Sequence, residues 1–175
     1  MDSRSKPLSP PEKLCPDHDL SEFDCGEPSL DDWLRRRALQ QNEETGASRT
    51  YVVCAGKRVV GYYARAVGAV VQAHAPGRVR RNMPDPVPVI IVGRLAVHKD
   101  FQGRKIGPAL MRDAVLRTLQ ASAIAGIRAI LVHAISERAR LFYEDCGFIS
   151  SPMDPMTLMI TVADAVKAFV GDDVP

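Results

Sequence analysis

VIIVGRLAVHKDFQGRKIGPALMRDAVLRTL, the sequence from Val89 to Leu119, contains the strongest indication of the fold. The run Val89–Val97 is almost continuously apolar, which is typical of a strand buried on both faces. A short basic loop with glycines follows and opens onto a helix expected from about Pro108 to Ala121. Backbone N–H groups at such a helix start bind anions, typically phosphate. The patterns GxxxxGK[ST] and GxGxxG are both missing, so this is neither a P-loop nor a Rossmann turn.

The bulk composition is that of an ordinary soluble globular domain. The chain has 175 residues, of which 46% are hydrophobic and 25% charged, with a net charge of +2. This balance carries no overall polyelectrolyte signal, so any nucleic-acid affinity must come from local basic clusters. No apolar run approaches the ~20 residues of a membrane span, and the N-terminus lacks the apolar core of a secretory signal. We therefore expect a cytoplasmic protein without membrane contact.

The cysteines and histidines do not show the spacing of metal ligands. Four cysteines lack a CxxC pattern, and reduced cytosolic thiols are the simplest account of them. His18, His74 and His98 are isolated from one another in the sequence. We expect no metal.

One domain is expected after a flexible start. Residues 1–13 are polar and proline-rich, and 14–175 form a single domain. A helix starts near Ser29, whose neighbours Asp31 and Asp32 suit a first turn, and ends at Gly46. The proline-rich stretch Ala75–Pro88 is predicted to be a loop. The other expected elements are strands at Thr50–Cys54, Arg58–Val71, Ala129–His133 and Thr157–Val162, and helices at Glu137–Cys146 and Ala163–Val170. This order predicts an α/β domain with a mixed, largely antiparallel sheet.

Three blocks of the sequence together resemble one family. They are Gly93–Val97 (GRLAV), Phe101–Gly107 (FQGRKIG) and Leu141–Phe148 (LFYEDCGF). In residue type and spacing they are similar to the GCN5-related N-acetyltransferase (GNAT) family, and the resemblance extends from Leu14 to Ile160. It implies the GNAT fold, a mixed central sheet flanked by helices, with a splayed strand pair at the acetyl-CoA site.

The N-terminal text LSEFDCGEPSLDDWLRRRALQ narrows the resemblance to the TacT-like acetyltransferase toxins of bacterial type II toxin–antitoxin modules. This implies a toxin that uses acetyl-CoA to acetylate the α-amine of aminoacyl-tRNA and so blocks translation. It also implies a homodimer that is neutralised by a ribbon-helix-helix antitoxin and that meets operator DNA only through the antitoxin complex.

The resemblance also implies the roles of particular residues. The backbone of Leu95, Ala96 and Val97 would meet the pantetheine, with the Val97 N–H near the acetyl carbonyl. The pyrophosphate would lie on a turn that departs from the family pattern, because Lys105 stands where the middle glycine is expected. The residues of this turn are Gln102, Gly103, Arg104, Lys105, Ile106 and Gly107. Tyr143 would protonate the leaving thiolate, since a phenol with a pKa of about 10 is protonated at neutral pH.

The central strand lacks a general base, which bears on the acceptor. Residues 89–98 contain no carboxylate and offer Arg94 instead. A lysine ε-amine, with a pKa of about 10.4, is costly to deprotonate unaided, whereas an α-amine titrates near 7.7–8.0, and lower still beside an ester. An α-amine acceptor is therefore favoured. Arg94, Arg80, Arg81 and Arg78 are the residues we expect at tRNA phosphates.

Two other functions remain open on the sequence alone. One is a GNAT enzyme that acetylates a small-molecule amine or a protein N-terminus. The other is a weakened enzyme that acts mainly as a partner in an antitoxin–DNA complex, which Lys105 motivates because a side chain there hinders the conformation that glycine allows.

Overall fold

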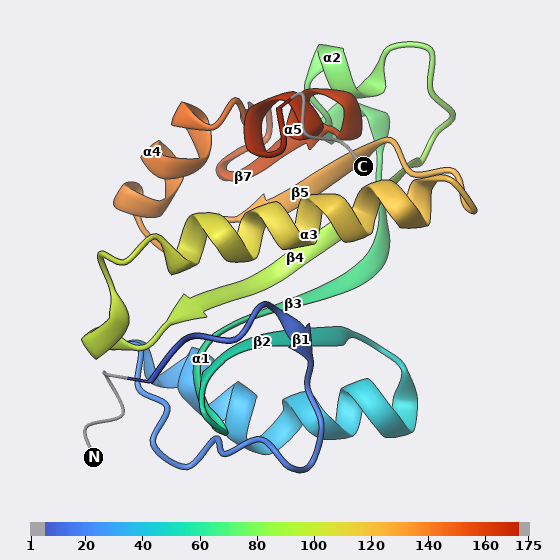
Figure 1. The fold of residues 1–175 in the computed structure, drawn as a ribbon. Coiled ribbons are helices and arrows are strands. Elements are labelled where there is room, and N and C mark those ends of the chain that lie inside the picture. Colours follow the sequence, from blue (N-terminus) through green and yellow to red (C-terminus); the bar gives the residue numbers. More distant parts are fainter. Residues whose placement is uncertain (1–5, 172–175) are drawn as a thin grey trace. The chain divides into compact units, whose positions relative to one another are not determined.

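A computed structural model describes residues 6–171, and the chain folds as two compact units (Figure 1). The first unit comprises the residues up to Ala66 together with Arg94–Asp113, and the second comprises Val67–Gly93 and the residues from Ala114 onward. Three long elements run through both units: β3 (Arg58–Val70), β4 (Val87–Val97) and α3 (Ile106–Ser122). Residues 1–5 of the predicted flexible start lie outside the described range, and the expectations of that start and of a single domain stay predictions.

The strands form a mixed sheet in the order β1-β2-β3-β4-β5-β7-β6. Strands β4 and β5 pair in parallel, and the ladders β1–β2, β2–β3, β5–β7 and β6–β7 are antiparallel. This confirms the predicted α/β class and the largely antiparallel sheet. The β4–β5 ladder joins Val89–Val92 to Ala129–Val132, whereas β4 itself runs on to Val97. The end of that ladder fits the expected splay of two strands.

The first unit packs an N-terminal helical run on its strands. The core gathers Phe23, Leu30, Trp33 and Leu34 against apolar residues of β2 and β3. Gly61 of β3 lets the start of α3 approach closely, because a Cβ there would stand 3.0 Å from Ile106 Cγ2. The remaining elements of this unit are β1 (Glu12–Lys13), α1 (Pro28–Trp33), the π-helices Leu34–Ala38 and Gln41–Thr45, β2 (Arg49–Ala55) and the 3₁₀ turn Lys99–Phe101.

The second unit covers its strands with short helices. Helix α5 contacts β7 and β5, and α2 and α4 contact β7 (Figure 1). A buried cluster joins Val79 of α2 to Val89, Leu131 and Met159. The remaining elements of this unit are the 3₁₀ turn Gln72–His74, α2 (Gly77–Arg80), β5 (Ala129–His133), α4 (Glu137–Asp145), β6 (Ile149–Ser151), β7 (Asp154–Thr161) and α5 (Val162–Phe169).

Two details of the sequence prediction are wrong. The stretch Ala75–Pro88 is not all loop, because α2 forms a single turn at Gly77–Arg80 around the fully buried Val79. One turn is too short to show a helical period in the sequence. The first helix starts at Pro28 rather than after Ser29, with no side-chain cap, and Asp31 instead accepts the Cys25 N–H at 2.9 Å.

The further prediction that Val89–Val97 is buried on both faces is only partly right. Val87, Val89, Ile90 and Val92 are buried, but Gly93 is exposed and Arg94, Leu95 and Val97 are half-buried. The expected tail helix forms as α5, and Gly147 follows α4 at φ 98°, as expected of a helix-ending glycine. Among residues 6–171, no helix is both long and apolar enough to pass through a bilayer.

Candidate functional site

The loop between β4 and α3 has the conformation of an anion-binding turn. Gly103 and Lys105 both have positive φ, 84° and 62°, and α3 begins at the next residue, Ile106. The N–H groups of Ile106 and Gly107 have no acceptor within the helix, because they belong to its first turn. Pro108 has no N–H to satisfy. The loop therefore presents backbone donors and the positive end of a helix dipole at one place.

His98 and Gln102 hold this loop in place. His98 is 3% exposed. Its backbone N–H donates to the Val60 carbonyl at 2.8 Å, and its ring Nδ1 accepts the backbone N–H of Asp100 at 3.0 Å. Because Nδ1 is an acceptor, a neutral ring carries its proton on Nε2, which then donates to the Glu22 carbonyl at 3.1 Å. Gln102 Nε2 donates to the Val97 carbonyl at 3.1 Å.

The segment just before α1 is fastened to the same loop. The Lys99 N–H donates to the Asp24 carbonyl at 2.9 Å, and Lys99 Nζ lies 2.9 Å from Asp24 Oδ2. Gln102 Nε2 also reaches the Cys25 carbonyl at 3.4 Å. Within the first unit, the loop between β4 and α3 is therefore held by hydrogen bonds to β3 and to the segment before α1. Sequence reasoning gave His98 no such role, because Val60 and Glu22, two of its partners, are remote in the chain.

A hollow of about 450 Å³ opens beside the segment before α1. Its charged side chains already have protein partners: Glu22 with Arg58, Asp24 with Lys99, and Arg35 with the Phe23 carbonyl. It therefore offers little free charge to a ligand. The hollow is lined by Ser21, Glu22, Phe23, Asp24, Pro28, Asp31 and Arg35.

Tyr143 lies in the second unit, within an aromatic cluster. Its ring centroid is 5.4 Å from that of Phe142 and 5.3 Å from that of Phe148. The residue is 8% exposed, and burial raises the pKa of its phenol to about 12. Within residues 6–171 the hydroxyl has no hydrogen-bond partner. The ring is thus fixed by packing, and the phenol keeps its proton at neutral pH.

The predicted basic residues differ in how far their charge is already neutralised. Arg78 forms a bidentate pair with Asp164, with Nη2 2.8 Å from Oδ1, and this pair lowers the pKa of Asp164 to about 2. Arg80 and Arg81, in the same unit, are exposed. Arg94, in the first unit, lies over the Trp33 ring at 4.3 Å. Arg78 is therefore the least available of the four to a phosphate.

The structure separates the predicted site residues into two groups. The first unit brings together Arg94, Leu95, Ala96 and Val97 on β4 with the loop Gln102–Gly107. The second unit holds Tyr143 on α4, and Arg78, Arg80 and Arg81 on and just after α2. Strand β4 contributes no carboxylate to either group.

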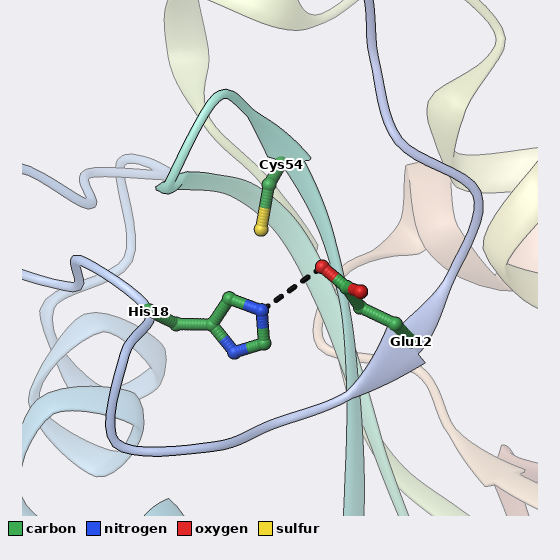
Figure 2. Close-up of side chains that lie close together, drawn as sticks. All are labelled: Glu12, His18 and Cys54. Carbon is green, nitrogen blue, oxygen red and sulfur yellow. Dashed lines mark hydrogen bonds and ion pairs between the residues drawn. The ribbon is translucent and has the colours of Figure 1, made fainter.

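One group of side chains has the composition of a metal site (Figure 2). Single ligand atoms of Glu12, His18 and Cys54 all lie within 4.8 Å of one another. His18 Nδ1 accepts the Cys15 N–H at 3.0 Å, so a neutral ring carries its proton on Nε2, which donates to Glu12 at 3.0 Å. Burial raises the pKa of the Cys54 thiol to about 11. A metal ion would have to displace the protons of His18 Nε2 and of the Cys54 thiol, and the structure instead joins His18 to Glu12 by a hydrogen bond.

Comparison with known proteins agrees with this geometry. The model of the acetyltransferase (GNAT) domain family matches residues 46–150. A tRNA-acetylating toxin of Mycobacterium tuberculosis (strain ATCC 25618 / H37Rv) is 53% identical over 164 residues, covering 94% of this chain and 98% of the toxin. The chain belongs to the GNAT acetyltransferase family.

Two solved structures of a toxin share the fold over nearly the whole chain. AtaT complexed with acetyl-methionyl-tRNAfMet is 28% identical with a TM-score of 0.82, covering 90% of this chain and 96% of that one. A tyrosine-to-phenylalanine mutant of AtaT, bound to the C-terminus of the antitoxin AtaR and to acetyl-CoA, is 27% identical with a TM-score of 0.79. That match covers 94% of this chain and 99% of the mutant.

Proposed function

We propose that this protein is a toxin that transfers the acetyl group of acetyl-CoA to the α-amine of aminoacyl-tRNA and thereby blocks translation. The observation that carries this proposal is the 53% identity, over 94% of the chain, to a tRNA-acetylating toxin. The fold shared with AtaT bound to acetyl-methionyl-tRNAfMet supports it independently. Acetyl-CoA is the co-substrate, and the chemistry requires no metal.

The first unit binds the co-substrate in this proposal. Leu95, Ala96 and Val97 meet the pantetheine along the part of β4 that continues past the β4–β5 ladder. The Val97 N–H polarises the acetyl carbonyl and stabilises the oxyanion that forms there. The pyrophosphate lies on the loop whose donors and helix dipole are described above. That loop consists of Gln102, Gly103, Arg104, Lys105, Ile106 and Gly107.

Tyr143 is the proposed proton donor. The amine nitrogen attacks the thioester carbonyl, the C–S bond then breaks, and the CoA thiolate takes the Tyr143 proton. The amine loses its own proton to water, and solvent reprotonates the phenolate. The raised pKa of Tyr143 keeps the phenol protonated over the whole range in which an α-amine becomes neutral. No carboxylate base is needed for such an amine.

The partners follow the same proposal. The tRNA phosphates contact Arg94, Arg80 and Arg81. Arg78 contributes less, because its charge is paired with Asp164. The toxin acts in the cytoplasm, where its charged tRNA substrate is found, and it forms the homodimer that the family resemblance implies. A ribbon-helix-helix antitoxin neutralises it, and operator DNA is bound only through the antitoxin complex. The structure of AtaT bound to the C-terminus of the antitoxin AtaR supports the proposal of an antitoxin partner.

The test is incubation with labelled acetyl-CoA and charged tRNA. We expect label on the aminoacyl group, released as an N-acetyl amino acid when the ester is hydrolysed. Transfer to free amines or protein N-termini but not to charged tRNA would replace the proposal with a GNAT enzyme of another acceptor. Acetyl-CoA that fails to bind in calorimetry would instead indicate a binding partner without activity.

Lys105→Gly is expected to weaken acetyl-CoA binding roughly threefold at low salt, because an exposed cation beside the pyrophosphate is lost. The left-handed φ of 62° strains a residue that carries a side chain by about 1 kcal/mol, so Lys105→Gly should also raise the free energy of unfolding. Calorimetry at two salt concentrations and denaturant unfolding check both effects.

Lys105→Ala is the matched control for this change. Alanine removes the ammonium but keeps the strain, so binding should weaken equally while the free energy of unfolding falls below that of the glycine variant. Tighter binding by Lys105→Gly would contradict a phosphate contact by the lysine.

A further inference from the structure

Arg94 is held by an aromatic face. Its guanidinium lies 4.3 Å above the Trp33 ring, and within residues 6–171 it makes no hydrogen bond or ion pair. Trp33 is stacked on Tyr62, with centroids 6.1 Å apart and planes at 13°. The Tyr62 hydroxyl donates to the Leu30 carbonyl at 2.8 Å, which ties the stack to α1. The support is rigid because Trp33 and Tyr62 are both buried.

Arg58, Arg65 and Arg104 also lie over aromatic rings, at 5.0–5.9 Å, but other arginines of the chain are paired with carboxylates. Arg78 pairs with Asp164, Arg140 with Glu137 and Glu144, and Arg35 with Asp32. A carboxylate fixes an arginine but also consumes its charge and its donors. An indole face fixes the plane of the guanidinium while the N–H groups around its rim stay free. Arg94 is therefore oriented and still able to bind an anion.

We propose that Trp33 is a positioning residue that orients Arg94 toward a phosphate of the nucleic-acid acceptor. This inference rests on the proposed function. It assigns to the single tryptophan of the chain a role in substrate recognition, in addition to its place in the core. Arg94 is the group that touches the ligand, and Trp33 acts through it.

The position of Arg94 on β4 selects nucleic acid over CoA as the source of the phosphate. The CoA phosphates are placed on the loop that follows Val97, whereas Arg94 precedes Val97 by three residues, or about 10 Å of strand. Arg94 therefore lies on the side of the acetyl-transfer point away from the loop. An aminoacyl ester carries its last phosphodiester one ribose away, so a phosphate on this side belongs to the acceptor.

The experiment measures binding of uncharged tRNA and of acetyl-CoA, each over a series of salt concentrations. Arg94→Ala should weaken tRNA binding and lower the salt slope by about one, because one phosphate contact is lost. Trp33→Leu should weaken tRNA binding about fivefold, because the released Arg94 side chain must then be ordered on binding, with the salt slope unchanged because the charge remains. Both variants should bind acetyl-CoA as the unmodified protein does.

Two further variants and one control variant make the test specific. Trp33→Phe retains an aromatic face and should restore most of the tRNA affinity. Arg94→Lys keeps the charge but not the planar stacking, so its tRNA binding should match that of Trp33→Leu. If Trp33→Leu does not fold, Arg94→Lys provides the same measurement. Lys57→Ala removes an exposed charge from the β2–β3 turn and is the control for net charge.

The outcomes separate this inference from the proposed function. Unchanged tRNA binding by Arg94→Ala, a reduced salt slope for Trp33→Leu or Arg94→Lys, or an equal loss of acetyl-CoA binding would overturn the inference. So would a protein that binds no tRNA. If the unmodified protein binds tRNA with these dependences but acetylates no charged tRNA, the proposed function fails and the inference stands.

Discussion

Tyr143→Phe is expected to lower kcat for acetyl transfer by about 10²-fold or more, the usual contribution of a general acid, while acetyl-CoA binding stays unchanged. The substitution removes only a hydroxyl, and that hydroxyl has no hydrogen-bond partner within residues 6–171. Packing of the ring on Phe142 and Phe148 is preserved, so the thermal midpoint should move little. Single-turnover kinetics with charged tRNA measure the loss in the chemical step directly.

The pH dependence provides a second measurement on the same residue. Burial raises the Tyr143 pKa to about 12, so the phenol keeps its proton as pH rises from 7 to 10. The rate should therefore climb as the acceptor amine loses its proton and then stay level, without a falling limb below pH 10. A fall centred near pH 9, or a Tyr143→Phe variant with normal kcat, would remove Tyr143 from the role of proton donor. Phe142→Leu, which changes a neighbouring ring, is the control for packing.

Charge reversal at two exposed arginines should have the second large effect. The double variant Arg80→Glu/Arg81→Glu is expected to weaken tRNA binding by roughly 10²-fold at low salt and to flatten the salt dependence, because two phosphate contacts become repulsive. Both side chains are exposed, so the fold should survive the change. Filter binding over a salt series and the KM for charged tRNA measure the effect, with the KM for acetyl-CoA unchanged.

The matched control reverses the same number of charges elsewhere. Lys13→Glu/Lys57→Glu alters two exposed lysines of the first unit and should leave tRNA binding within about threefold. Equal losses in both double variants would mean that net charge alone governs binding. Arg78→Ala should weaken tRNA binding less than the Arg80→Glu/Arg81→Glu variant does, because the Arg78 charge is already paired with Asp164.

Sequence patterns were sufficient for elements whose cause is local. The sequence predicted β2 and β3 as two strands and β4 from its apolar run, and Gly46 and Gly147 end helices in left-handed conformations, as expected. The departure at Lys105 was also readable, because the position requires the positive φ that the structure has. Strands β1 and β6 and helix α2 were not predicted, since elements of two to four residues show no period.

Local patterns in the sequence thus establish the α/β class, the strand–loop–helix that offers donors to a phosphate, the family, and the residue types of the proposed site. How available each charge is depends on the folded arrangement of the side chains. The tertiary structure places Arg94 on Trp33, pairs Arg78 with Asp164, and clamps the loop through His98. The physical reason is range: helix and strand patterns arise between neighbours in the chain, whereas an arginine's partner is whichever side chain folding brings beside it.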